Sequence, residues 1–181
     1  MNRCKWCNLK NQNYIYYHDN VWGKLITSDE YLYKMLILES FQAGLSWECV
    51  LNKMPNFEVA YDNFDIDKVM GFDENKVNEL LLNKGIIRNK NKILASINNS
   101  RIFKSIVNEY GSFYKYLCNF TKDKIYYENN LVTSPLSDAI SKDLQKRGMK
   151  FVGSTIIYSF LQAVGIIYSH EKECFLYKSN V

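Results

Sequence analysis

The chain contains only two histidines, and each lies within reach of a cysteine. Cys4 and His18 are close together near the start of the chain. His170 and Cys174 are four residues apart near its end, a spacing that places both side chains on one face of a helix. Two thiolates and two imidazoles complete a tetrahedral Zn²⁺ site with no position left for water, which is typical of structural sites. Such a site would join the two ends of the chain.

Two other interpretations of these residues stay open at this point. Cys4 and Cys7 form a Cys-x2-Cys pair, which together with His170 and Cys174 makes a second possible ligand set. The same side chains can also be ordinary histidines and unrelated buried thiols, because spacing alone does not bring together two segments that lie so far apart in sequence.

Glu39 is the next residue whose surroundings indicate chemistry. It interrupts an otherwise apolar helical run from Met35 to Phe41, and a carboxylate on such a surface is unfavourable unless it has a partner. An aromatic box around one acid suits a flat, cationic ligand such as an extruded base. The alternatives are an exposed Glu39, or core aromatics packed around an ion pair. The aromatic residues in the neighbouring motifs are Trp6, Tyr14, Tyr16, Tyr17, Trp22 and Trp47.

The segment 81–93 has the pattern of a helix, a tight glycine turn and a second helix. Gly85 allows close approach of the backbone, and the free amides of the turn and of the following helix N-terminus can hold a phosphate. Arg88, Lys90 and Lys92 place cations beside it. This pattern is typical of a helix-hairpin-helix DNA-binding element; the alternative is a plain helix connection with a solvated, charged face.

Helical periodicity dominates the elements that must position these residues, and no strand-like alternation lasts more than a few residues. We therefore expect an all-α fold. A helix that begins with the capping-box pattern at Thr27–Glu30 should carry Glu39 and end at Gly44. The other expected helices cover approximately residues 46–54, 57–64, 73–82, 89–97, 102–120 with a break near residue 111, a stretch from residue 134, and 154–167, which is apolar nearly all round and therefore buried.

The length and composition of the chain limit the classes of protein to which it can belong. A length of 181 residues and 47% hydrophobic content predict one domain, residues 1–181, and the net charge of +4 permits a polyanionic partner. No secretory segment and no membrane-spanning stretch is evident, and the odd number of cysteines favours a reduced, cytoplasmic protein. Phosphate-loop, dinucleotide-binding and nucleophile-elbow patterns are absent. A Ser or Cys catalytic triad would have to use one of the proposed metal ligands.

Several long motifs, in order along the chain, resemble the bacterial 3-methyladenine DNA glycosylase I family. The resemblance extends from the first residues to the His170–Cys174 pair and is weakest over residues 121–133. The motifs that carry it are Tyr17-His-Asp-Asn-Val-Trp-Gly23, Leu38-Glu-Ser-Phe-Gln-Ala-Gly-Leu-Ser-Trp47, Gly85-Ile-Ile-Arg88 and Lys146-Arg-Gly-Met-Lys-Phe-Val-Gly153, followed by Tyr158-Ser-Phe160.

The resemblance implies a helix-hairpin-helix glycosylase fold, with two helical subdomains around a base-binding cleft. It implies one structural Zn²⁺ per chain, held by Cys4, His18, His170 and Cys174, and it gives Cys7 no part in the site. Glu39 and Tyr17 are the implied catalytic residues. The implied base pocket consists of Trp6, Tyr14, Tyr17, Glu39 and Trp47, and the implied DNA-binding residues are Gly44, Leu45, Gly85, Ile86, Arg88 and Lys90.

The function implied is hydrolytic release of 3-methyladenine from alkylated double-stranded DNA by a monomer that extrudes the damaged nucleotide. No amine nucleophile is evident, so we expect no strand-cleaving lyase activity. Two functions of other classes remain as rivals. A non-catalytic, zinc-clasped DNA-binding module would need the hairpin but not Glu39, and a small-ligand binder would need the aromatic pocket but not Arg88 and Lys90.

Overall fold

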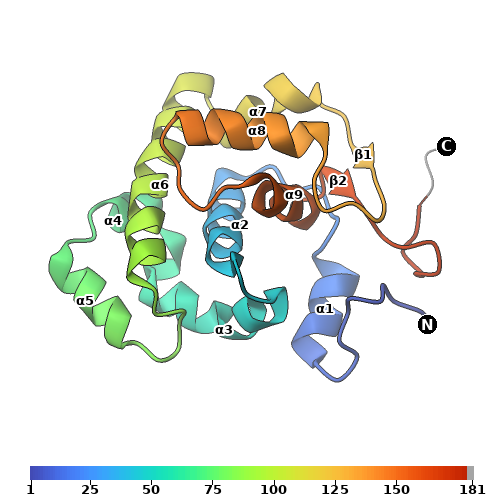
Figure 1. Cartoon of the computed structure of the whole chain (residues 1–181), viewed down its shortest axis with the longest axis horizontal. Helices are drawn as coiled ribbons and strands as arrows, with labels where there is room; N and C mark the ends of the chain where they lie inside the picture. Colours follow the sequence, from blue (N-terminus) through green and yellow to red (C-terminus); the bar gives the residue numbers. More distant parts are fainter. Residues whose placement is uncertain (179–181) are drawn as a thin grey trace.

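The computed structural model describes residues 1–178, and helices account for most of this part of the chain (Figure 1). The fold is mostly helical, which confirms the predicted class, and one short pair of strands is added. In chain order the elements are α1 (Gln12–Asn20), α2 (Asp29–Gln42), α3 (Trp47–Ala60), the 3-10 helix η1 (Asp62–Phe64), α4 (Ile66–Met70), α5 (Glu74–Leu82), α6 (Lys90–Tyr110), α7 (Phe113–Thr121), β1 (Tyr126–Tyr127), α8 (Pro135–Lys146), α9 (Ser154–Ala163) and β2 (Ile167–Tyr168).

Helix α2 lies at the centre of the molecule, and α3, α6, α7 and α9 pack against it (Figure 1). Its residues from Met35 to Phe41 are all buried, which explains why this run is apolar except at Glu39 and Ser40. Helix α9 packs against both α2 and α8 and is largely buried, as expected from its composition. It ends at Ala163, a few residues earlier than predicted.

Two helix boundaries were predicted wrongly. Helix α3 continues through Pro55, where the sequence predicted an end and a second, shorter helix. Phe57 and Ala60 are buried together with Val50 and Leu51 on the same helix, so tertiary packing outweighs the hydrogen bond that proline cannot donate. Helix α6 is a single helix of 21 residues, not two, and it ends where Gly111 adopts a left-handed conformation with φ of 84°.

Helix α1 and the strands β1 and β2 were not anticipated from the sequence. Helix α1 is capped at its N-terminus by Asn11, whose side chain accepts hydrogen bonds from the amides of Asn13 and Tyr14. Strands β1 and β2 pair in parallel, with Tyr126 opposite Ile167. A pair this short leaves no alternating pattern to detect, because each strand contributes only two residues.

The two ends of the described chain lie side by side (Figure 1). The Phe175 amide donates to the Asn2 carbonyl over 2.9 Å, and the Lys5 amide donates to the Glu171 carboxylate over 3.1 Å. Within residues 1–178, no helix is long and apolar enough to cross a membrane.

Candidate active site and metal site

A cavity of about 350 Å³ opens beside α2 and collects side chains from both ends of the chain. Every residue predicted for the base pocket lines it: Trp6, Tyr14, Tyr17, Glu39 and Trp47. A volume of this size suits a small planar molecule. The sequence did not single out the remaining residues of the lining, which are Gln42, Asn130, Leu131, Ser159, Gln162, Ser169 and Glu171, and it named Trp22 only as one of the nearby aromatics.

Glu39 reaches this cavity from the buried face of α2 and is only 2% exposed. Burial raises the pKa of its carboxyl well above the usual range. Its Oε2 has no hydrogen-bond partner among the described residues, and the same holds for Oε1 of Gln42 and Nε1 of Trp47. Three buried polar groups around one cavity therefore leave hydrogen-bonding capacity that a ligand with a polar edge can use.

Gln42 could have been found from the sequence, because it follows Glu39 by three residues and therefore shares its helix face. Residues 130, 131, 159, 162 and 169 had no comparable signal. They reach the cavity only because α9, β2 and the segment after β1 fold against α2.

Aromatic rings form much of the cavity wall. The rings of Tyr17 and Trp47 are 5.4 Å apart, centroid to centroid, and those of Trp6 and Tyr14 are also 5.4 Å apart. Tyr17 is buried, and desolvation together with the nearby Glu39 carboxyl raises the pKa of its phenol well above the usual range. Tyr17 therefore keeps its proton and can donate a hydrogen bond. The cavity thus combines ring faces with a carboxyl group, and it suits a flat ligand that carries positive charge.

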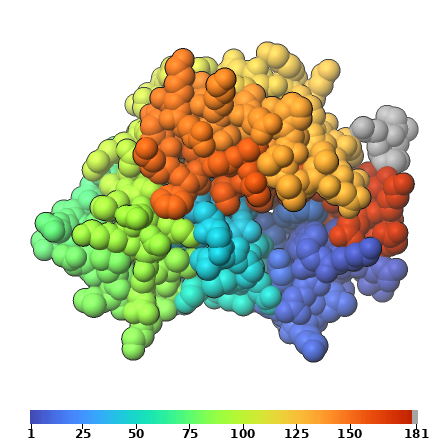
Figure 2. Space-filling model, viewed as in Figure 1, coloured from blue at the N-terminus to red at the C-terminus, as the bar shows by residue number. Residues whose placement is uncertain are grey.

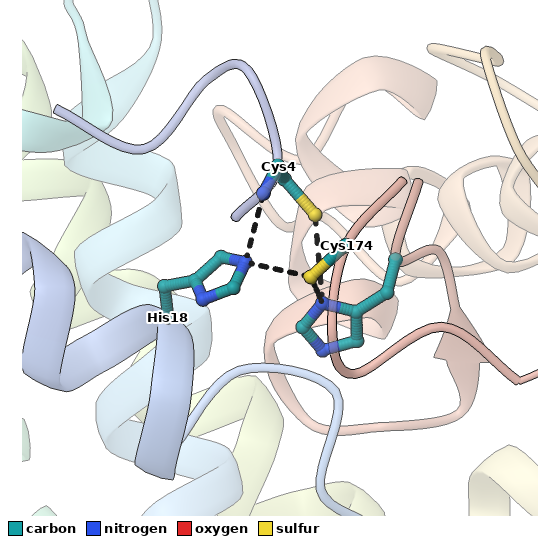
Figure 3. Close-up of side chains that lie close together, drawn as sticks. Cys4, His18 and Cys174 are labelled. Carbon is teal, nitrogen blue, oxygen red and sulfur yellow. Dashed lines mark hydrogen bonds between the residues drawn. The ribbon is translucent and has the colours of Figure 1, made fainter. Parts of the chain in front are cut away.

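The predicted metal ligands converge at the junction of the two chain ends. Cys4, His18, His170 and Cys174 are all buried, and their four ligand atoms lie within 4.8 Å of one another. Figure 3 shows Cys4, His18 and Cys174 directed toward a common point. Segments at opposite ends of the sequence are thereby brought together, and these four residues could bind a metal ion.

The distances fit a tetrahedral ion. Cys174 Sγ lies 3.5 Å from His18 Nε2 and 3.5 Å from His170 Nδ1, and Cys4 Sγ lies 3.5 Å from His170 Nδ1. With Zn–S bonds of about 2.3 Å and Zn–N bonds of about 2.0–2.1 Å, tetrahedral angles separate a sulfur and a nitrogen ligand by about 3.5 Å. The donor set and its spacing therefore match Zn²⁺.

Neighbouring residues form hydrogen bonds that orient the four candidate ligand side chains. His18 Nδ1 lies 2.7 Å from Asp19 Oδ1, which turns Nε2 toward the cluster, where the Cys4 amide donates to it over 3.3 Å. Arg3 donates to both carboxylate oxygens of Asp19 and lowers the pKa of that carboxyl. The amide of Glu171 donates to Cys4 Sγ over 3.4 Å. Such contacts fix the histidine ring and favour the thiolate form that a metal requires.

When no cation is bound, burial disfavours the charged forms of the thiols and imidazoles in this cluster. It raises the pKa of the Cys4 thiol to about 12 and lowers the pKa of His170 to about 4. A divalent cation would offset the charge of two thiolates, so metal binding should displace protons.

The alternative ligand set with Cys7 is wrong. Cys7 lies outside the cluster of four, and its Sγ is directed at the carbonyl of Tyr14, 3.8 Å away. The second member of the Cys-x2-Cys pair is therefore a buried thiol beside α1.

The metal site and the cavity share aromatic side chains. The Trp6 ring lies 5.2 Å from the His18 ring, and the Trp22 ring lies 4.7 Å from the His170 ring. Both tryptophans also line the cavity. Loss of the metal cluster should consequently loosen one wall of the cavity.

The turn of Gly44 and Leu45, two of the predicted DNA-binding residues, follows α2 directly. Gly44 is exposed with φ of 77°, a left-handed conformation that favours glycine, and no heavy atom lies within 4 Å of where a Cβ would be. Leu45 is 42% exposed, and its amide donates to the Gln42 carbonyl over 2.6 Å. The turn therefore projects from the end of the helix that carries Glu39.

The predicted hairpin lies between α5 and α6. Packing inside the protein favours glycine at position 85, because a Cβ there would lie 2.9 Å from Asn56 Cγ. The sequence did not reveal this contact. Its amide already donates to Asn83 Oδ1 over 2.8 Å, so it is not free for a phosphate. Ile86 is buried and anchors the turn.

Two of the three cations predicted beside the hairpin are on its surface, whereas Lys92 is buried and its Nζ donates to the carbonyls of Phe41 and Ala43. Arg88 and Lys90 are exposed at the start of α6. The Asn89 side chain caps this helix by accepting from the Lys92 amide, which leaves the amides of Lys90 and Asn91 as free first-turn donors. The helix N-terminus rather than the glycine turn therefore offers the anion-binding groups.

Comparison with known proteins identifies the family. The model of the methyladenine glycosylase family matches residues 6–177. The chain belongs to this family. DNA-3-methyladenine glycosylase 1 of Escherichia coli K12 is 39% identical over 186 residues, which cover 99% of each protein. The DNA-3-methyladenine glycosylase of Haemophilus influenzae is 32% identical over 95% of this chain and 96% of its own.

Solved structures of 3-methyladenine DNA glycosylase I superpose closely on this fold. A crystal structure has a TM-score of 0.92 at 38% identity and covers 98% of this chain and 100% of its own. The Staphylococcus aureus protein has a TM-score of 0.92 at 32% identity and covers 99% of each chain. This methyladenine glycosylase family member is therefore a DNA glycosylase, as the sequence predicted, and the two non-enzymatic alternatives are wrong.

Proposed function

We propose that this family member is a base-excision repair enzyme that extrudes an alkylated nucleotide from double-stranded DNA and hydrolyses its bond to 3-methyladenine. The observation that carries the proposal is the buried Glu39 carboxyl, which faces an aromatic-walled cavity with one oxygen unpaired. Family membership supports the reaction type, and one relative has been solved in complex with 3-methyladenine.

The chemistry follows from the charge of the substrate. Methylation at N3 makes the adenine nucleoside cationic, so the base leaves readily and needs little protonation by the enzyme. The site must then favour the cationic base over ordinary adenine, and it must stabilise an oxocarbenium-like sugar as the bond breaks. Glu39 supplies a hydrogen-bond acceptor and, when it ionises beside a cationic base, negative charge in a buried position, while Tyr17 and Trp47 supply stacking surface.

Water completes the reaction. None of the residues that line the cavity is a lysine, so no side-chain amine is at hand to form a covalent imine with the sugar. We therefore expect base release without strand cleavage. Glu39 and Tyr17 are the proposed catalytic residues, and Trp6, Tyr14 and Trp47 complete the proposed base pocket.

DNA would be held by two exposed segments. The turn at Gly44 and Leu45 would occupy the gap left by the extruded nucleotide. The hairpin of Gly85 and Ile86, with the adjacent Arg88 and Lys90, would contact phosphates through side-chain charge and the first-turn amides of α6. We further propose that the chain acts as a monomer with one glycosylase domain, residues 1–181, whose two helical subdomains flank the cavity.

The metal in this proposal is one structural Zn²⁺ per chain. Four protein ligands leave no open coordination position, so the ion would hold the two chain ends together and would not activate water. Its ligands include two thiols that must stay reduced, and the substrate is chromosomal DNA. Both points favour the cytoplasm as the site of action.

The experiment is chromatography of the bases that the purified protein frees from methylated duplex DNA, together with electrophoresis of the same DNA. The proposal expects 3-methyladenine in the soluble fraction and intact strands. Failure to release 3-methyladenine would refute the substrate assignment. Release accompanied by enzyme-dependent nicking would refute the hydrolytic mechanism alone.

A further inference from the structure

Phe151 combines two features that do not favour folding. Its φ of 55° lies in the left-handed region, which is unfavourable for a residue with a Cβ. Its ring is 37% exposed, so the side chain gains only part of the stabilisation available from burial. An aromatic residue that keeps both features at a fixed place on the surface is a candidate for a functional contact.

The loop that carries Phe151 is held in place on both sides. The buried Asn99 side chain donates to the Lys150 carbonyl over 2.8 Å and accepts from the Lys150 amide over 2.9 Å. Ser141 Oγ, also buried, donates to the Val152 carbonyl over 2.7 Å. These contacts fix the backbone immediately before and after Phe151. The fold therefore holds Phe151 at a fixed place on the surface.

The ring lies beside the end of α2. Lys92 Nζ is 6.0 Å from the centroid of the Phe151 ring. The same ammonium donates to the carbonyls of Phe41 and Ala43 over 2.8 and 2.6 Å. Phe151 is thus next to the turn that begins at Gly44. In Figure 2 the orange segment containing this loop borders the cyan segment that follows α2, on one face of the molecule.

The charge of this face indicates what the ring can contact. Exposed cations lie on the neighbouring segments, with Lys150 directly before Phe151 in the same loop and Lys90 at the start of α6, two residues before Lys92. Leu45 adds a second exposed apolar side chain. Exposed apolar side chains together with exposed cations suit a duplex from which one nucleotide has been extruded, because unstacked base faces then lie close to phosphates.

We propose that Phe151 is a DNA-contacting residue that packs its ring against the bases exposed when the damaged nucleotide leaves the helix. The inference rests on the proposed function, because only an extruding enzyme creates that surface. Phe151 would then contribute to affinity for a gapped site and little to affinity for intact duplex. Its left-handed backbone would be retained for this contact rather than for stability.

The test compares Phe151→Gly and Phe151→Leu with the unaltered protein. Glycine relieves the left-handed backbone and removes the ring, whereas leucine keeps apolar bulk at the same position. Fluorescence anisotropy would measure affinity for a duplex with a stable abasic-site analogue and for intact duplex, at one salt concentration. Thermal unfolding would be measured in parallel. Tyr127→Ala is the control, because Tyr127 is an aromatic of similar exposure, 36%, on β1.

Removal of one stacking interaction should weaken binding of Phe151→Gly to the abasic duplex about tenfold. Binding to intact duplex should change much less, the melting temperature should be equal or higher, and Phe151→Leu should fall between the two. The Tyr127→Ala variant should bind like the unaltered protein. Equal affinity of Phe151→Gly and the unaltered protein for the abasic duplex would overturn the inference, and so would a clear fall in melting temperature.

Base release by the unaltered protein separates this inference from the proposed function. Release of 3-methyladenine with unchanged abasic-site affinity in Phe151→Gly would reject the role of Phe151 alone. If the unaltered protein frees no base, the proposed function fails, and the anisotropy comparison still decides whether Phe151 contacts DNA.

Discussion

Replacement of Glu39 by glutamine isolates the contribution of one charge to base release. The substitution keeps the shape of the side chain and one acceptor oxygen, and it removes the ionisable group whose negative charge would face a bound cationic base. We expect severely reduced release of 3-methyladenine from methylated DNA and nearly unchanged stability. Both expectations follow from the burial of Glu39, which is 2% exposed with Oε2 unpaired.

The size of the effect can be bracketed. Two unit charges about 4 Å apart attract by about 4 kcal/mol at an effective dielectric constant of about 20, which is an upper limit for a desolvated pair. Hydrogen bonds to charged partners exceed neutral ones by about 1–1.5 kcal/mol, which is a lower limit. The range corresponds to a loss of about 10- to 1,000-fold in kcat/KM.

The folding stability of Glu39→Gln should be equal to or higher than that of the unaltered protein. Burial raises the pKa of Glu39 above its unfolded value of 4.5. Between these two pKa values the unfolded chain releases its proton and the folded protein retains it, so this group makes the fold less stable as pH rises. Glutamine carries no such penalty. The variant should therefore have an equal or higher melting temperature at neutral pH.

The same reasoning gives a pH dependence. If the carboxylate is the active form, kcat/KM should fall as pH decreases through the raised pKa of Glu39, well above pH 4.5. This acid limb should be absent from the profile of Glu39→Gln. A pH profile with the same limb in both proteins would assign the titration to another group.

The assay is base release measured below saturation, with thermal unfolding of the same preparations. Glu30→Gln is the matched control, since Glu30 is an exposed residue of the same helix and its substitution changes net charge equally. Wild-type kcat/KM in Glu39→Gln would refute the catalytic role. A large loss of stability in that variant would indicate that Glu39 has a structural role instead.

Three further predictions address metal, DNA and specificity. Metal analysis of the purified protein should find about one zinc per chain. The His18→Ala variant should lose this zinc and unfold at a lower temperature, whereas Cys7→Ala should retain it. Replacement of Arg88 and Lys90 by alanine should reduce the slope of log affinity against log salt by about 0.9 for each phosphate that the protein no longer neutralises, on any duplex sequence, and an unchanged slope would place DNA elsewhere. 7-Methylguanine should be released poorly or not at all, because the acceptor-only carboxylate of Glu39 would face the O6 acceptor of guanine instead of the amino group of adenine; comparable release rates from methylated DNA would contradict this argument.

The sequence was most informative where chemistry restricts residue type. Tetrahedral zinc coordination accepts few side chains, and the chain has only two histidines, so the four candidate ligands could be named before their convergence was known. Glu39 stood out because a carboxylate within an apolar run requires an explanation. The structure places Glu39 in the cavity wall with the four predicted aromatics, and their roles in base binding remain predictions.

The sequence was least informative where tertiary packing overrides local preference. Pro55 marks a helix end by local rules, yet α3 continues because the residues on both sides of it are buried. Gly85 indicated close approach of DNA, whereas the structure shows close approach of Asn56. Ser159 and Gln162 reach the cavity only through the packing of α9, and no spacing rule connects them with Glu39.

The central claim is that this cavity binds 3-methyladenine, and the tryptophans provide a direct measurement. All three tryptophans of the chain, Trp6, Trp22 and Trp47, line the cavity, so a ligand that enters the cavity should change the intrinsic tryptophan fluorescence. Titration with 3-methyladenine should change the emission saturably, adenine should have little effect at the same concentrations, and Glu39→Gln should weaken the response. Emission unaffected by 3-methyladenine, or affected equally by adenine, would contradict the account.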